Sequence, residues 1–135
     1  MSTQHAPSVL PLTEQQGRAA LKTVLNILEK WGCSREEKKA LLGIEADSTF
    51  FKYQKDPSSA RVSRDTMERL SYLLNIHAAL RILFTAPESV YGWVRKPNNH
   101  PFFAGRSAME IMTQGRVVDL YEVMTRLNSE RGGWA

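Results

Sequence analysis

Side chains able to do acid–base, nucleophilic or metal chemistry are few in this chain and lie far apart. The three histidines stand at positions 5, 77 and 100, and the one cysteine at position 33. Glu110 and Asp119 come nearest to a carboxylate pair, but their spacing across two expected helices is no acid–base signature, and a surface role is the default for both. The sequence has no phosphate loop, dinucleotide-binding turn, nucleophile elbow or Cys/His metal-ligand cluster. We therefore predict no catalytic residue, no metal ligand and no cofactor, in a chain that is not an enzyme.

The residues with the most distinctive order are those of a binding surface, in the stretch 91–115. An aromatic helix end is followed there by a basic pair, a polar turn, two phenylalanines, a glycine and a new helix. Pro97 and Pro101 each fix their own φ and restrict the residue before them, so the turn between them is rigid. Gly105 frees the chain to bend before Ser107 caps the next helix. A rigid, aromatic loop with a polar tip indicates a surface shaped for a protein partner.

A second candidate surface lies in the N-terminal half, where two short helices joined by a tight, glycine-containing turn follow a longer one. The longer helix begins at a capping box opened by Thr13, and the short helices are expected at 34–42 and 48–55. This is the helix-turn-helix pattern. Phe50 and Tyr53 lie three apart and are expected to face inward, which leaves the opposite side free to face a major groove. The residues predicted to contact DNA are Lys39, Ser48, Thr49, Lys52, Lys55, Arg61 and Arg64.

The same pattern has a purely structural interpretation, because three packed helices with such a turn also occur in proteins that bind no DNA. The turn here is one residue longer than the common form. Phe51 on the outward face suits a thymine methyl group or a protein neighbour equally well. Arg61 and Arg64 are phosphate clamps on one interpretation, and solvated charges beside acidic neighbours on the other. Both interpretations stay open on sequence alone.

The remaining elements are also expected to be helices. Ser63 opens the longest one, about 23 residues ending near position 86, which is apolar on most sides in its second half and therefore central. Pro87 begins a short helix, and two more are expected at 107–113 and from 117 to about 131. His77 lies on the apolar stripe of the long helix without other ligands at metal spacing. A hydrogen-bonded core or interface histidine is therefore expected there.

Composition allows one compact domain, or two small helical halves that share a core. The chain has 135 residues, 42 % of them hydrophobic, and a net charge of +4, which permits nucleic-acid binding without requiring it. The uncharged run 70–80 is well short of the roughly 18 residues of a membrane-spanning helix, and the N-terminus lacks a signal-peptide pattern. Cys33 has no partner for an internal disulfide, and we interpret it as a small buried side chain rather than a reactive thiol. We expect a cytoplasmic protein.

The C-terminal stretch resembles the toxin-binding domain of the Xre/MbcA/ParS antitoxins. The matching residues are Trp93, Pro97, Asn98, Phe102, Gly105, Ser107, Glu110, Met112 and Gly115, followed by one amphipathic helix and the tail Gly132-Gly133-Trp134-Ala135. Two departures from the family pattern are Ala108, where a proline is usual, and methionines at 109 and 112 in place of a leucine pair. The likeness extends back to about residue 14, because the family also carries a helix-turn-helix-like N-terminal half.

The resemblance implies an antitoxin of a type II toxin–antitoxin system, with a RES-domain toxin, a class that attacks NAD⁺, as its partner. It implies inhibition by occlusion, in which aromatic anchors fill pockets on the toxin and the tail blocks access to the cofactor. Trp134 has the alternative of folding back onto its own last helix. The residues predicted to bind the toxin are Trp93, Pro97, Asn98, Phe102, Gly105, Arg106, Met109, Arg131, Gly132, Gly133 and Trp134.

The expected architecture is all-α, with a helix-turn-helix-like three-helix unit packed through the long central helix onto a small toxin-binding domain. The expected boundaries are a flexible arm at 1–12, a DNA-binding or dimerisation domain at 13–60, and a toxin-binding domain at 61–135. Operator DNA and a second copy of the chain are the further partners, because such antitoxins often repress their own operons as dimers. The alternative function is a stand-alone helix-turn-helix transcription regulator whose C-terminal half only dimerises.

Overall fold

The structure, a computed structural model, describes residues 12–133, with side chains described to residue 130. Every regular element in this part of the chain is a helix. In order they are α1 (Glu14–Lys30), α2 (Arg35–Leu42), α3 (Asp47–Lys55), η1 (Pro57–Ser59), α4 (Arg64–Leu83), α5 (Pro87–Gly92), η2 (Trp93–Arg95), α6 (Ala108–Met112) and α7 (Val117–Gly133). An antiparallel bridge between Pro97 and Ser107 is the one strand-like pairing among the described residues. The predicted all-α fold is confirmed.

Local capping fixes where the first two helices begin and end. The Thr13 hydroxyl accepts from the Gln16 amide at 3.1 Å, while the Thr13 amide donates to the Gln16 side chain at 3.0 Å. A second capping box of the same kind opens α2 at Ser34, as predicted. Gly32 and Gly43 follow the two helices with φ of +72° and +70°, the left-handed conformation that glycine adopts at low cost. These helix boundaries therefore follow from local sequence.

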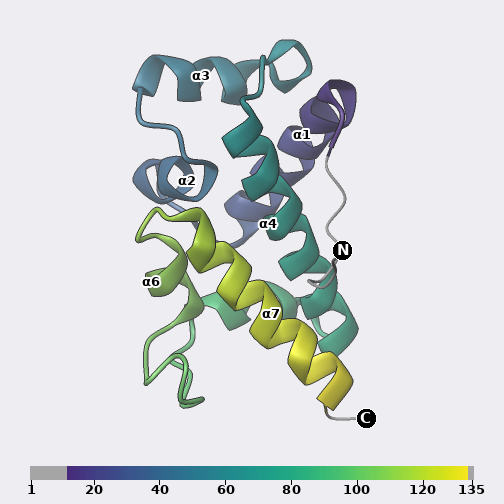
Figure 1. The fold of residues 1–135 in the computed structure, drawn as a ribbon, viewed down its shortest axis with the longest axis vertical. Coiled ribbons are helices and arrows are strands. Elements are labelled where there is room, and N and C mark those ends of the chain that lie inside the picture. The colour runs from purple at the N-terminus through teal and green to yellow at the C-terminus, as the bar shows by residue number, and fades with distance from the viewer. Residues whose placement is uncertain (1–11, 134–135) are drawn as a thin grey trace, which may run out of the picture.

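The helix α4 is the axis of the fold, and Figure 1 shows it running through the middle of the molecule with α7 beside it. It packs against α1, α2, α5 and α7. Leu70, Leu73, Ile76 and Leu80 along it have no exposed surface. The helix ends at Leu83, three residues before its predicted end, because Phe84 already adopts an extended conformation, with φ −127° and ψ 143°.

The N-terminal end of α4 holds the helix-turn-helix unit in place. The Thr66 hydroxyl donates to the Leu42 carbonyl at 2.8 Å, and the Arg69 guanidinium donates to the Ala40 carbonyl at 3.2 Å. Both carbonyls belong to the last turn of α2, whose carbonyls lack partners within the helix. Phe50 and Tyr53 of α3 are buried, as predicted, so the opposite side of α3 faces solvent. Figure 1 shows α3 at the top of the molecule, crossing above α4.

Two sequence-based expectations about the C-terminal half are corrected. The helix α7 continues through Gly133, two residues past its predicted end, so Gly132 and Gly133 belong to the helix rather than to a tail after it. Asp119 is not a surface group, because its side chain is 5 % exposed and accepts from the Arg116 guanidinium at 2.7 Å and 3.1 Å. The predicted arm, apart from its last residue, and Trp134 lie outside the described residues. No helix in the described part of the chain has both the length and the apolar character needed to cross a membrane.

Candidate partner-binding surfaces

The first candidate surface is the loop 96–106, here called the proline loop, between η2 and α6. The Asn98 amide donates to the Arg106 carbonyl at 3.1 Å, and the Gly105 amide donates to the Asn98 carbonyl at 2.8 Å, so the two arms of the loop pair with each other. The Asn98 side chain also accepts from the His100 amide at 2.8 Å. Gly105 has φ +85°, which confirms the predicted bend. Internal hydrogen bonds therefore hold this loop in one shape.

An aromatic cluster fastens the proline loop to the core. Phe103 is 2 % exposed, and the rings of Trp93 and Phe102 meet it edge-on, with centroids 5.9 Å and 5.0 Å away. The Arg126 guanidinium, from α7, lies 4.4 Å from the centroid of the Phe102 ring, within the range of a cation–π contact. Trp93 and Phe102 are each half-buried, so part of each ring remains accessible on a rigid support.

Most of the residues predicted to bind a toxin do lie on or beside this loop. Pro97, Gly105 and Arg106 are exposed, and Asn98 is half-buried. Met109 is different, because it is 2 % exposed and packs inside the core, which removes its side chain from the surface. The predicted positions 131–133 form the last turn of α7, and Trp134 lies outside the described residues. The proline loop and the end of α7 both lie toward the bottom of Figure 1, away from α3.

The second candidate surface is a pocket of about 460 Å³ beside the outward side of α3, here called the α3 pocket. Its lining residues are Thr49, Lys52, Tyr53, Lys55, Asp56, Ser59, Ala60 and Arg61. Four of the seven residues predicted to contact DNA are therefore brought together. Ser48 and Arg64 are exposed but do not line the pocket.

Charge in the α3 pocket is mostly positive. Lys52, Lys55 and Arg61 face one carboxylate, that of Asp56. Hydrogen bonds from the hydroxyls of Ser58 at 2.6 Å and Ser59 at 2.7 Å lower the pKa of Asp56, so this carboxylate stays ionised and internally bonded. The three cations have no ion-pair partner among the described residues. This pocket has the charge and size to accept an anionic oxygen group such as a phosphate.

Lys39 does not share in this positive surface. Its ammonium donates to the Asp47 carboxylate at 2.8 Å, and that hydrogen bond raises the pKa of Lys39 and lowers that of Asp47. Its side chain is only 13 % exposed. The residue ties α2 to the first turn of α3, so its charge is already compensated and it does not line the α3 pocket.

Arg95, which sequence reasoning left without a role, links the two halves of the chain. Its guanidinium donates to the Trp31 carbonyl at 3.0 Å and the Gly32 carbonyl at 2.9 Å, at the end of α1. It also forms two hydrogen bonds with the Glu37 carboxylate, at 2.9 Å and 2.7 Å, which lower the pKa of Glu37. The sequence signals only a basic residue before the proline loop, because its partners lie about sixty positions away.

His77 and Cys33 are the remaining groups with chemistry of their own. His77 stacks on the Tyr91 ring, with centroids 5.5 Å apart, and its buried Nδ1 has no hydrogen-bond partner among the described residues. The predicted hydrogen bond within the core is therefore not found, and an interface role for His77 stays a prediction. Burial, followed by the charges of Arg81 and Lys30, lowers the pKa of His77. Burial raises the pKa of Cys33 to about 11, in agreement with a small buried side chain. Within the described residues, no three His, Cys, Asp or Glu side chains gather as metal ligands.

Comparison with known proteins matches both halves of the chain. Residues 11–75 match the antitoxin Xre-like helix-turn-helix domain, and residues 79–133 match the antitoxin Xre/MbcA/ParS C-terminal toxin-binding domain. The uncharacterized protein y4oB of Sinorhizobium fredii (strain NBRC 101917 / NGR234) is 45 % identical over 115 residues, which cover 85 % of this chain and 86 % of y4oB. No solved structure matches the chain significantly.

Proposed function

The chain belongs to the Xre/MbcA/ParS antitoxins, with a helix-turn-helix domain followed by a toxin-binding domain, and from this premise we propose that it neutralises a RES-domain toxin and represses its own operon. The observation that supports the proposal most is that the two candidate binding surfaces lie far apart. The proline loop with its aromatic cluster lies at one end of the molecule, and the α3 pocket lies at the other. We place both activities in the cytoplasm, where an operator is accessible.

Toxin inhibition rests on the half-exposed rings of Trp93 and Phe102. Buried aromatic anchors and arginines carry most of the energy of protein interfaces. The proline loop is already held by its own hydrogen bonds, and Arg126 and Phe103 hold the Phe102 ring, so little conformational freedom is lost on binding. In this proposal the anchors fill pockets at the rim of the NAD⁺ cleft, and the end of α7 with the residues after it covers the cleft. The residues assigned are Trp93, Pro97, Asn98, Phe102, Gly105, Arg106, Arg131, Gly132, Gly133 and Trp134.

Substitution of Phe102 by alanine tests the anchor role. We expect a loss of about 2 kcal/mol or more in toxin binding, roughly thirty-fold in Kd by calorimetry, together with a weaker rescue of growth on co-expression. Phe51→Ala is the matched control, because Phe51 is a 49 % exposed phenylalanine on α3 at the far end of the molecule. Deletion of residues 131–135 tests the tail separately, and undiminished inhibition by that variant removes the tail from the mechanism. Equal toxin affinity of wild type and Phe102→Ala rejects the anchor.

Operator binding rests on the α3 pocket, where we assign Lys52, Lys55 and Arg61 to phosphate groups and Ser48 and Thr49 to the groove. Arg64 is assigned to the flanking backbone. Lysines and arginines that neutralise phosphates make affinity fall with salt, because each contact releases condensed counterions. Two-fold operators are read by two-fold dimers, so we include a homodimer in the proposal.

The test uses a DNA fragment from upstream of the chain's own reading frame. Arg61→Ala is expected to weaken binding and to reduce the slope of log K against log salt by about one. Lys22→Ala is the control, since Lys22 is an exposed cation on α1 that does not line the α3 pocket. An unchanged salt slope for Arg61→Ala removes that phosphate contact. If the chain represses its own operon but does not reduce the lethality of the neighbouring toxin, the alternative of a stand-alone transcription regulator is favoured.

A further inference from the structure

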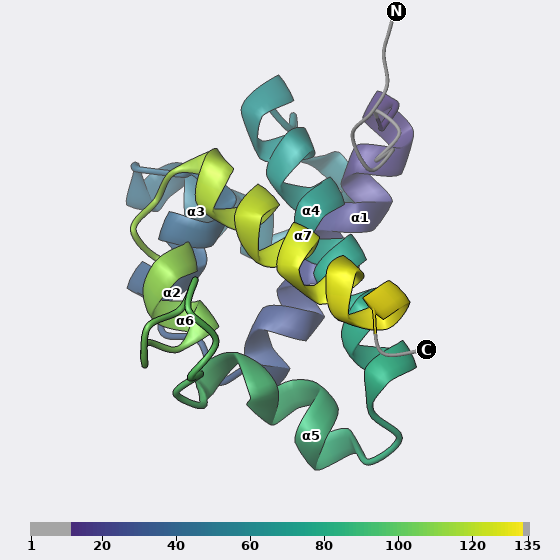
Figure 2. The same cartoon turned by 60° about the horizontal axis from the view of Figure 1, so that its bottom comes forward.

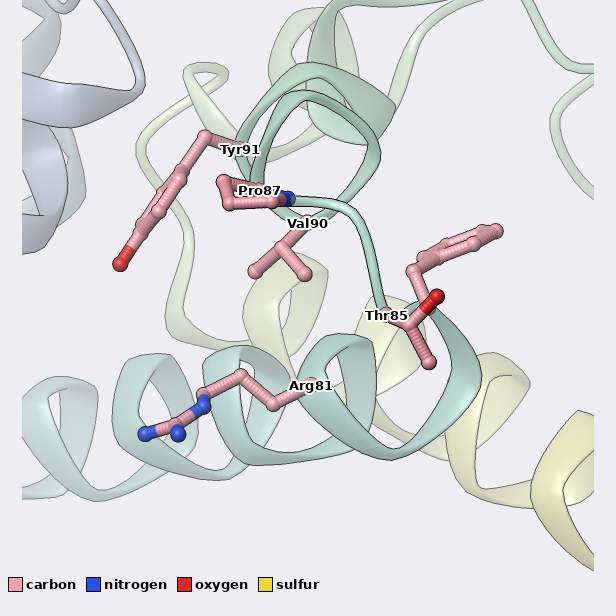
Figure 3. Close-up of a pocket in the computed structure, with 6 residues that line it drawn as sticks. Arg81, Thr85, Pro87, Val90 and Tyr91 are labelled. Carbon is pink, nitrogen blue, oxygen red and sulfur yellow. The ribbon is translucent and has the colours of Figure 1, made fainter.

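A groove of about 460 Å³ between the end of α4 and the start of α5 has no role in the functions proposed above. We call it the α5 groove. Its lining residues are Arg81, Phe84, Thr85, Pro87, Val90 and Tyr91. Val90 is 5 % exposed, and Val90, Pro87 and Phe84 make up the apolar part of the lining. Figure 3 shows the Arg81 side chain and the Tyr91 ring extending the same way from α4 and α5, so a cation and a hydroxyl flank one side of the groove.

The positive charges at this groove are not compensated. Arg81 has no ion pair or hydrogen bond with any described residue, whereas Arg69, Arg95 and Arg126 are each paired with a carboxylate. The Lys30 ammonium, from α1, lies 5.1 Å from the centroid of the Tyr91 ring and likewise has no acidic partner among the described residues. No carboxylate lines the groove. Glu88 on α5 is exposed and is not one of the lining residues. The groove therefore combines apolar lining residues with one unpaired cation, Arg81, and a second unpaired cation, Lys30, contacts the Tyr91 ring at its side.

The charges of Arg81 and Lys30 both reach His77, which packs against the groove residue Tyr91. Its ring stacks on Tyr91, with centroids 5.5 Å apart and planes inclined by 23°. After burial, the causes that lower the pKa of His77 are the positive charges of Arg81 and Lys30. An anion seated between these cations would oppose that effect, which makes His77 a reporter of occupancy.

We infer that the α5 groove is a second docking site for the toxin, and that it takes a segment with a carboxylate beside an apolar side chain. This inference rests on the proposed function. Charge complementarity with Arg81 selects an acidic segment, and the apolar lining residues select a hydrophobic neighbour for the acid. A second copy of this chain fits poorly, because a two-fold contact here would bring the clusters of Arg81 and Lys30 toward each other.

Location supports the same partner. The helix α5 leads directly through η2, which contains Trp93, into the proline loop. Figure 2, in which the bottom of Figure 1 has come forward, shows α5 along the lower edge, between the proline loop and the end of α4. A partner that covers Trp93 therefore lies next to the α5 groove without bridging the molecule.

The test compares binding of the full chain to the catalytically inactive toxin encoded beside it. Arg81→Glu is expected to raise Kd by about ten-fold or more, because it replaces the attracting charge with a repelling one. Lys22→Glu, the same charge change at an exposed position of α1, is expected to leave Kd within about two-fold. Circular dichroism checks the fold of each variant, and Arg81→Gln, expected to weaken binding less, serves if the charge reversal unfolds the chain.

An NMR titration of the histidines gives a second readout. The pKa of His77 is expected to rise in the complex relative to the free chain. If Kd is unchanged in both Arg81→Glu and Arg81→Gln, or if the pKa of His77 does not move, the α5 groove is not a docking site. The proposed neutralisation of the toxin is still supported in that case if Phe102→Ala weakens binding. A wild-type chain that does not bind the toxin rejects both. A dimer that Arg81→Glu converts to monomer assigns the groove to a second copy and also overturns the inference.

Discussion

Replacing Arg95 by alanine removes a side chain that joins the segment before the proline loop to the end of α1 and to α2. Its guanidinium donates to two carbonyls at the end of α1, those of Trp31 and Gly32, and to both oxygens of Glu37. Alanine leaves the two carbonyls without a donor and the carboxylate without its cation. We expect Arg95→Ala to destabilise the whole domain, because these contacts join segments about sixty residues apart.

The magnitude follows from how exposed these groups are. The side chains of Arg95 and Glu37 are 37 % and 28 % exposed, so solvent screens the ion pair and it contributes about 0.5–1 kcal/mol. The two donations to carbonyls at a helix C-terminus contribute about 1–2 kcal/mol together. The sum is about 1.5–3 kcal/mol, which lowers Tm by roughly 6–12 °C in a domain of this size.

Urea unfolding at pH 7, followed by circular dichroism, measures this loss. Arg95→Lys keeps the charge but not the planar fork, so we expect it to lose at least about half of the stabilisation. Since the Arg95 hydrogen bonds lower the pKa of Glu37, the wild type gains stability above the usual value of 4.5 and loses it as pH falls through the folded pKa. That acid dependence should weaken in Arg95→Ala. A Tm within about 2 °C of the wild type would refute the reasoning, because the contacts would then be no better than contacts with water.

Three further predictions concern single residues. Because the pKa of His77 is lowered in the folded chain, the unfolded chain binds this proton more readily, and the stability that His77 contributes is full above about pH 6.5 and falls below it. The variant His77→Phe should lose this pH dependence of Tm between about pH 5 and 7. A Tm profile equal to that of the wild type would contradict the prediction. Cys33, with its pKa raised to about 11, should react with Ellman's reagent at pH 8 only after unfolding in guanidinium, and rapid labelling of the folded chain would contradict its burial. Gly105→Ala should lower the free energy of unfolding in urea by about 1–2 kcal/mol, because φ at this position is +85° and a side chain is strained there. Ala104→Gly, at φ +53°, should change the free energy of unfolding by less than about 1 kcal/mol. Equal effects of the two variants would exclude backbone strain as the cause.

Features that depend on neighbours within one turn of chain could be predicted from the sequence. Thr13, Ser34 and Ser107 each open a helix through a capping box with the residue three positions on. Gly32 and Gly43 end helices in the left-handed conformation. The family pattern of the C-terminal half also depends on short spacings, which is why the resemblance and the all-α fold could be predicted from the sequence.

Features set by distant segments could not be predicted in the same way. Met109 lies in the core because α6 packs on α7 and η2, and no spacing within α6 distinguishes an inward from an outward methionine. Arg95 finds partners across the whole N-terminal half. Asp119 did carry a local signal, an arginine three positions before it at a helix start, although burial beneath that arginine depends on tertiary packing.

The helix α4 explains how one small chain can present two separate surfaces. Its first turns fasten the helix-turn-helix unit through Thr66 and Arg69, and its last turn forms one wall of the α5 groove through Arg81. The α3 pocket and the toxin-facing surfaces share no residue, so occupation of one leaves the other accessible. The helix α4 and the Arg95 contacts both connect the two ends, so either can transmit an effect of one partner on the affinity for the other. Arg95 is a single, partly exposed side chain that can be replaced without disturbing α4. An Arg95 variant therefore allows the stability of the chain and the effect of one partner on the affinity for the other to be measured together.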